Sequence, residues 1–138
     1  MEVKINKQII HDGEIIPFNL TQTNPEIKFP KTQNTYYTIL MVDPDAPSPS
    51  NPIYKYWLHW LVINNSDTIA FYHYPSPPPG SGYHRYIFFV FAQKKWINPS
   101  DLGLKINKDS DRKNFNLGSF IHRFELEMIY TTYFQTSR

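Results

Sequence analysis

The sequence of 138 residues contains no cysteine, which excludes disulfide bonds, thiol catalysis and cysteine-bound zinc. It also lacks an excess of charge, because 14 basic and 12 acidic residues leave +2, too little to indicate a nucleic-acid partner. No stretch approaches the roughly 20 apolar residues of a membrane span, and charges interrupt the N-terminus where a signal peptide would be apolar. These absences predict a cytoplasmic protein without a transmembrane segment, for which peripheral contact with a membrane stays open.

Glycine is scarce, whereas proline and aromatic residues are abundant. Twelve prolines stand against five glycines, and aromatic residues make up 17% of the chain. Aromatic side chains favour pleated strands, and proline interrupts helices. We therefore expect one mainly β domain over residues 1–138.

Apolar runs bounded by turn residues mark the expected elements. The longest runs are apolar on both faces, which is typical of central strands covered on two sides. The expected elements are a hairpin with its turn at His11–Gly13, strands at 36–42, 54–64 and 83–93, an irregular polar region at 94–113, a short helix at 114–124 and a last strand at 125–134.

Polar side chains interrupt this apolar pattern where the expected strands meet loops. Asp43 and Asp45 follow one strand, and a residue before a proline is held in extended geometry, which lowers the entropic cost of binding a ligand. A period of two places Trp57, His59 and Leu61 on one face of the next strand. We expect the polar ends of neighbouring strands to meet at one small cavity.

His84 and Tyr86 share a face of the strand that follows the bend at Gly80–Gly82. Two partly protonated imidazoles beside a carboxylate can donate hydrogen bonds to an anionic oxygen. The glycines of the bend would let backbone N–H groups approach a ligand closely. These residues predict a small anion-binding pocket, suited to a phosphate monoester or diester with a small organic group.

Three blocks of the sequence together resemble the signature of the phosphatidylethanolamine-binding protein family, which includes Raf kinase inhibitor protein and plant flowering regulators. The blocks are "VDPDAP", "YKYWLHWLVIN" and "PPPGSGYHRYIFFVF", and "RKNFNLGSF" resembles a further segment of the family. The resemblance covers residues 3–135. It implies a β-sandwich with a central antiparallel sheet and one or two short helices.

The resemblance also implies a pocket for phosphorylated head groups and no cofactor. Several members regulate kinases or signalling complexes through protein contacts, so a phosphate-bearing small molecule or phospholipid head group and a signalling protein such as a kinase are the implied partners. No enzymatic turnover is implied. The ligand-binding residues that the resemblance implies are Asp43, Pro47, Trp57, His59, Ser76, Pro77, Pro78, His84 and Tyr86.

The sequence departs from the family pattern at the pocket rim and at its end. Tyr74 and Ser76 stand where glycines are common, so we expect Tyr74 to narrow the mouth and Ser76 to add a hydroxyl group. The sequence ends at Arg138, whereas many animal members continue into a C-terminal helix. We therefore expect a compact member with a more open pocket.

Two functions of different classes follow from these residues. The first is a phosphate-binding regulatory module that acts through protein partners. The alternative is a metal-dependent or acid–base phosphoester hydrolase that uses Asp43, His59 and His84. The absence of a closely spaced His-x-x-x-His pair and of a nucleophile beside a base speaks against the hydrolase.

Several charged residues are expected to have structural or solvent-exposed places. Arg85 should face away from His84 and pair with Asp45. His73 and the Arg112–Lys113 pair are expected at the solvent surface.

Overall fold

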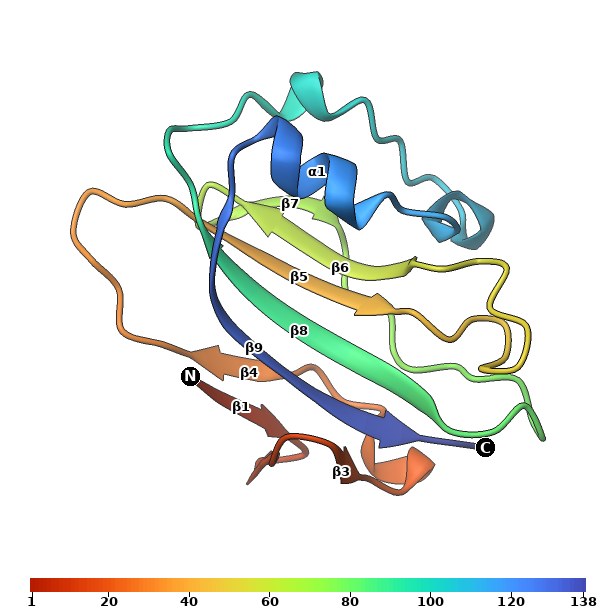
Figure 1. The fold of residues 1–138 in the computed structure, drawn as a ribbon. Helices are drawn as coiled ribbons and strands as arrows, with labels where there is room; N and C mark the ends of the chain where they lie inside the picture. The colour runs from red at the N-terminus through yellow and green to blue at the C-terminus, as the bar shows by residue number, and fades with distance from the viewer.

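The computed structural model describes residues 1–138 and contains two β-sheets and one α-helix (Figure 1). The larger sheet has six strands in the order β3-β9-β8-β5-β6-β7, antiparallel throughout except that β3 runs parallel to β9. Its strands are β3 (Glu14–Ile15), β5 (Tyr37–Asp43), β6 (Trp57–Ile63), β7 (Asp67–Ala70), β8 (His84–Ala92) and β9 (Glu127–Thr136). The protein is thus mainly β, as the composition predicted.

The smaller sheet is antiparallel and has the order β2-β1-β4. Its strands are β1 (Glu2–Ile5), β2 (Gln8–Ile9) and β4 (Glu26–Lys28). The helices are α1 (Leu117–Arg123) and three short 3₁₀ turns, η1 (Phe18–Leu20), η2 (Pro99–Leu102) and η3 (Asp109–Arg112). None of them has the length and apolar character that crossing a bilayer requires.

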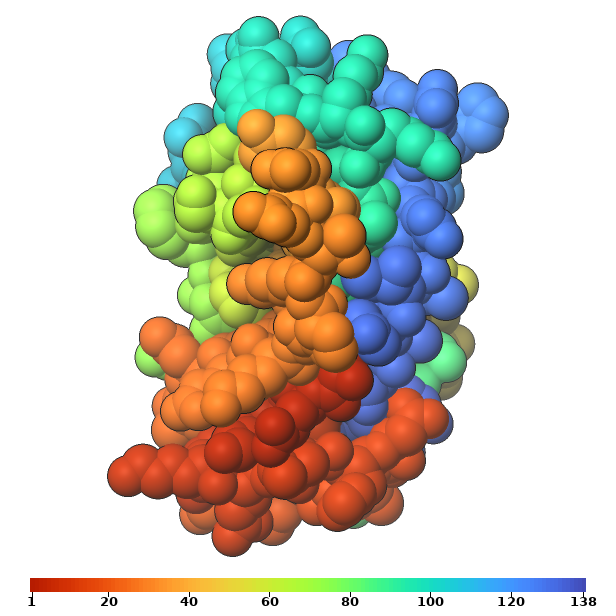
Figure 2. Space-filling view, turned by 90° about the vertical axis from the view of Figure 1, so that its left-hand side faces the viewer, coloured from red at the N-terminus to blue at the C-terminus, as the bar shows by residue number.

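Each face of the six-stranded sheet is covered by a different layer (Figure 1). The smaller sheet closes one face, where Val3 and Ile5 of β1 pack with Met41, Phe88 and Phe134. The helix α1 and the loops around it close the other face. The core residues on that side include Leu58, Phe91, Leu117, Phe120 and Leu126. Figure 2 shows the N-terminal residues, in red, at one end of the molecule and the teal residues that follow β8 at the opposite end.

The strand β8 follows the predicted alternation closely. Its residues His84, Tyr86, Phe88 and Val90 are all fully buried, and the intervening Arg85 is exposed. The strand lies between β5 and β9, so both edges are hydrogen-bonded. The sequence prediction of a central strand is confirmed here.

A β-bulge breaks the predicted alternation in β6. Met41 pairs with Trp60 and Val42 pairs with Leu58, which leaves His59 without a partner in β5. One extra residue reverses the facing of the side chains beyond it. Leu61 therefore joins Leu58 in the α1-side core, and its predicted place beside His59 is wrong.

The N-terminal hairpin turns at a different place from the one predicted. The turn between β1 and β2 is Asn6–Lys7, and both residues have positive φ, 50° and 66°, as a type I′ turn requires. Gly13, at φ 79°, instead directs the chain into β3, and its N–H donates to the carbonyl of Tyr133 in β9. The predicted hairpin around His11–Gly13 is wrong because β3 pairs with β9 in place of β2.

Candidate functional site

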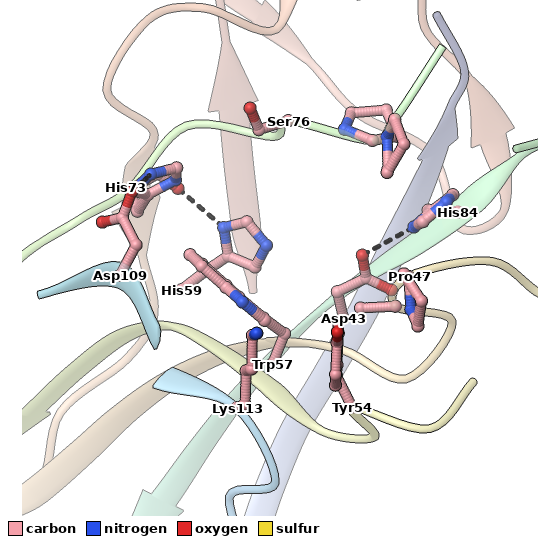
Figure 3. A pocket seen from close by; sticks show the side chains of 13 residues that line it. Asp43, Pro47, Tyr54, Trp57, His59, His73, Ser76, His84, Asp109 and Lys113 are labelled. Carbon is pink, nitrogen blue, oxygen red and sulfur yellow. Dashed lines mark hydrogen bonds and ion pairs between the residues drawn. The ribbon is translucent and has the colours of Figure 1, made fainter. Parts of the chain in front are cut away.

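A cavity of about 240 Å³ lies where β5 ends and where β6 and β8 begin (Figure 3). We call it the Asp43 cavity. Eight of the nine predicted ligand-binding residues line it: Asp43, Pro47, Trp57, His59, Ser76, Pro77, Pro78 and His84. Five further residues that were not predicted also line it: Ala46, Tyr54, His73, Asp109 and Lys113.

Antiparallel pairing brings the polar strand ends together. The last residue of β5, Asp43, pairs with the first residue of β6, Trp57. On the other side of β5, Val42 pairs with Ile87, so the start of β8 with His84 lies beside the end of β5. The loops that follow these strand ends form the cavity walls. The expected meeting of polar strand ends is thus what the fold produces.

Asp43, His84 and Ser81 form a hydrogen-bonded row at the cavity floor. Asp43 Oδ2 lies 2.8 Å from Nδ1 of His84, and His84 Nε2 lies 2.9 Å from the Ser81 hydroxyl oxygen. The single Ser81 hydroxyl hydrogen goes to the carbonyl of Pro78 at 2.7 Å, because a carbonyl only accepts. His84 Nε2 must therefore carry a hydrogen and donate it to Ser81.

One proton is shared between Asp43 and His84. Both groups are at least 95% buried, and burial raises the pKa of Asp43 despite the hydrogen bond from His84. The pair exists either as carboxylate with imidazolium or as carboxylic acid with neutral imidazole, and its net charge is zero in both forms. Each His84 nitrogen already has a protein partner, so this ring has no free N–H for a ligand.

His59 is held in one tautomer by the backbone. Its Nδ1 lies 2.8 Å from the carbonyl oxygen of His73 and must donate to it. Burial lowers the pKa of His59 to about 3, so the ring is neutral near pH 7 and its Nε2 carries only a lone pair. Figure 3 shows this second nitrogen pointing into the cavity, toward Asp43. The expectation that both imidazoles donate hydrogen bonds to an anion is therefore wrong.

We predict that the His59 ring does not titrate between pH 5 and 8. At this ring the folded state binds fewer protons than the unfolded state between about pH 3 and 6.5, so this ring alone lowers stability as the pH falls through that window. Long-range ¹H–¹⁵N spectra should show the Nδ1–H tautomer throughout, with the signals assigned by a His59→Gln variant. A titration midpoint between pH 5 and 8 would contradict this assignment.

Tyr86 lies beneath the cavity and does not line it. Its ring is fully buried, makes an edge contact with His59 at 5.2 Å and stacks on His84 at 6.3 Å between ring centroids. Its hydroxyl group has no hydrogen-bond partner, and burial raises its pKa. Tyr86 therefore supports both histidines and keeps an unused donor below them.

The rim of the cavity is a proline segment, residues 75–79, with a single backbone donor. Four of its five residues are proline, so Ser76 has the only N–H. The Ser76 side chain lines the cavity as expected, whereas Tyr74 packs edge-on against Tyr72 and does not narrow the mouth.

The backbone N–H groups of the glycine bend beside the rim are hydrogen-bonded within the protein. The N–H groups of Gly80 and Ser81 donate to the carbonyls of Arg138 and Pro78, so neither approaches a ligand as predicted. Positive φ angles at Gly80 and Gly82 make the turn that places Ser81 against His84.

Two basic residues expected at the surface belong to the site. Arg112 is buried and donates to the carbonyls of Leu58, His59 and Phe71, while its guanidinium group lies 5.6 Å from the centre of the Trp57 ring. Lys113 lines the cavity, and its amine lies 4.1 Å from the centre of the Tyr54 ring (Figure 3).

His73 also stands at the mouth of the cavity, 3.6 Å from Asp109, although it was expected on the open surface. The contacts of these residues run to distant parts of the chain, which local patterns do not report. By contrast, the predicted ion pair of Arg85 with Asp45 is present and bidentate, with distances of 2.9 and 3.0 Å.

Known proteins are similar to this chain over nearly its whole length. The family model for phosphatidylethanolamine-binding protein matches residues 6–70 and 63–134. A phosphatidylethanolamine-binding protein homolog from Acanthamoeba polyphaga mimivirus is 49% identical over 138 residues, which cover 99% of this chain and 96% of the relative. The chain belongs to the phosphatidylethanolamine-binding protein family.

Other members of this similarity group differ more in sequence or in length. A 26 kDa secreted antigen of Toxocara canis is 31% identical over 140 residues, and the chain spans 53% of that relative. The phosphatidylethanolamine-binding protein of Plasmodium vivax has a TM-score of 0.72 at 23% identity, with 91% of this chain and 78% of that chain covered. At that identity the Plasmodium structure shows a shared phosphatidylethanolamine-binding protein fold.

Within this phosphatidylethanolamine-binding protein fold, no group of three His, Cys, Asp or Glu side chains is arranged to hold a metal ion. The carboxylate of Asp43 and both nitrogens of His84 are already bonded within the protein. The metal-dependent hydrolase that the sequence left open thus lacks a ligand set in this arrangement.

Proposed function

We propose that the Asp43 cavity binds a small phosphate-bearing anion and that the protein acts as a binding module. The proposal rests on the polar residues that line this one small cavity. Lys113, Ser76 and Tyr54 line the cavity together with Trp57, and the Lys113 amine lies 4.1 Å from the centre of the Tyr54 ring. A cationic amine and a backbone N–H are good partners for phosphate oxygens, and an aromatic wall strengthens such contacts by excluding water.

A catalytic role is less well supported. A general base works best when its pKa lies near the working pH, and the pKa of His59 is about 3. Both ring nitrogens of His84 are hydrogen-bonded within the protein, to Asp43 and to Ser81. We therefore favour binding without turnover over acid–base hydrolysis.

Membership of the family supports a ligand-binding regulatory role in general terms. A kinase or another signalling protein as the partner, a phospholipid head group as the ligand, and a location in the cytoplasm all stay predictions. Ile53, beside the cavity residue Tyr54, is 58% exposed and offers an apolar contact to a protein partner next to the site.

Binding of inorganic phosphate tests the proposal. We expect millimolar or tighter binding, seen as shifts of the Ser76 amide and the Trp57 indole in ¹H–¹⁵N spectra at pH 6. Replacing Lys113 with alanine should weaken binding by about five- to tenfold, because one charge-assisted hydrogen bond at a partly solvated site is lost.

The matched control is Lys105→Ala, an exposed lysine that does not line the cavity. Equal weakening by both lysine variants would indicate general attraction of an anion to a basic protein. Unshifted Ser76 and Trp57 signals at tens of millimolar phosphate would overturn the proposed function.

A further inference from the structure

The floor of the Asp43 cavity presents hydrogen-bond acceptors, although its proposed ligand is an anion. His59 Nε2 is an acceptor because Nδ1 has taken the ring's one hydrogen to the carbonyl of His73. The shared proton lies between the Asp43 carboxyl group and Nδ1 of His84. The hydrogen on Nε2 of His84 is donated to Ser81. No histidine N–H therefore remains for a ligand.

Burial keeps His59 in this state, and a nearby cation adds to the effect. The guanidinium group of Arg112 donates to the carbonyl of His59 itself at 3.1 Å and stacks on Trp57, whose ring lies 4.5 Å from the His59 ring. An imidazolium at this buried ring would add a second positive charge near this one. The lone pair of His59 Nε2 is thus a fixed property of the fold.

Resting on the proposed function, we propose that the cavity selects the singly protonated form of a phosphate monoester, whose P–O–H group donates a hydrogen bond to Nε2 of His59. The remaining oxygens face the Lys113 amine and the Ser76 N–H at the rim. A phosphodiester, such as the phosphate of an intact phospholipid, has no P–O–H group. It would set an oxygen lone pair against the His59 lone pair.

The other charged and titratable groups around the cavity do not supply the missing donor to His59. Asp43 and His84 share their proton, and Tyr86 lies beneath the floor. His73 and Asp109 face each other at the mouth, and Lys113 lines the wall. The donor to His59 must therefore come from the ligand.

Three ligands of similar size and equal charge test this selection. At pH 5.5 methyl phosphate is mainly a monoanion with one P–O–H group, because the second pKa of phosphate monoesters is about 6. Dimethyl phosphate and methyl sulfate are monoanions without a hydroxyl group. We expect methyl phosphate to bind wild-type protein about tenfold more tightly than either, because only it satisfies the buried acceptor. Its affinity should fall as the pH rises through about 6 toward 8.

A His59→Gln variant provides a second test, beside the comparison of ligands on the wild-type protein. A glutamine amide can turn to donate or to accept, so the preference for methyl phosphate over methyl sulfate should shrink to about twofold. A His122→Gln variant changes an exposed histidine that does not line the cavity, and it should keep the tenfold preference. The comparison of ligands on the wild-type protein stands even if the His59 variant does not fold.

The outcomes separate this inference from the proposed function. Equal binding of the three ligands, or affinity that rises with pH, would overturn the inference and leave phosphate binding intact. Tight binding of glycerophosphoethanolamine with weak binding of dimethyl phosphate would also overturn it, because an ammonium group would then be the donor to His59. Binding of none of these ligands at tens of millimolar would overturn both proposals.

Discussion

Replacing Arg112 with alanine is expected to lower the free energy of unfolding by about 2–4 kcal/mol. The guanidinium group holds three backbone carbonyls, those of Leu58, His59 and Phe71, at 2.8 to 3.1 Å. Its loss would remove the donor to the buried carbonyl of Leu58 and would open a void against Trp57, whereas the carbonyl of His59 would keep the N–H of His73. Urea denaturation at neutral pH measures the effect.

Two further substitutions sharpen this test. Arg123 is an exposed arginine of α1, and its replacement by alanine should change stability by no more than about 0.5 kcal/mol. The loss of stability in Arg112→Lys should lie between those of Arg112→Ala and Arg123→Ala, because one ammonium group cannot reach three carbonyls in the geometry of a planar guanidinium. A loss below about 1 kcal/mol in Arg112→Ala would show that water replaces the guanidinium group freely.

The same substitution should also damage the site. Arg112 joins the bulge at His59 to the segment after β7 through the Phe71 carbonyl, and that segment supplies the carbonyl of His73. Folded Arg112→Ala protein should therefore bind phosphate more weakly than the Lys113→Ala variant does. The two neighbouring cations thus differ in role: Arg112 is buried and does not line the cavity, whereas the exposed Lys113 lines it.

Replacing Asp43 should also lower the free energy of unfolding, by an amount that depends on the residue that replaces it. Alanine at this position would leave His84 Nδ1 and the N–H of Asp45 without partners, which should cost about 2–4 kcal/mol. Asparagine can accept from Asp45 through its oxygen and donate to a neutral His84 through its amide. Asp43→Asn should therefore cost less than about 1.5 kcal/mol.

This contrast measures whether the fold requires the pair as carboxylate and imidazolium or also accepts a neutral His84. If a full carboxylate and imidazolium were essential to the fold, asparagine would be as damaging as alanine. Equal losses in Asp43→Asn and Asp43→Ala would contradict the prediction that the fold accepts a neutral His84. Thermal or urea unfolding of both variants at pH 7 gives the comparison.

Much of the fold was predictable because its central strands are long and apolar. The run at Tyr37–Asp43 and the run at His84–Ala92 have no alternative to burial on both faces, and both became central strands. The meeting of Asp43, His59 and His84 then follows from antiparallel pairing of strands whose polar residues stand at their ends. The family blocks pointed to the same residues.

The remaining features depend on contacts that local patterns do not report. The bulge at His59 is set by pairing with β5, and both strands are equally apolar on either side of it. The tautomer of His59 depends on a backbone carbonyl 14 residues away, and the burial of Arg112 depends on carbonyls more than 40 residues away. The sequence therefore indicated which residues meet, but not which of them donate and which accept.

A crystal structure of the wild-type protein with inorganic phosphate would show directly whether the Asp43 cavity binds phosphate. We expect one phosphate in the Asp43 cavity, with oxygens at hydrogen-bond distance from the Ser76 N–H and from His59 Nε2, and with the Lys113 amine turned toward it. An empty Asp43 cavity at tens of millimolar phosphate, or phosphate bound only elsewhere on the surface, would contradict it.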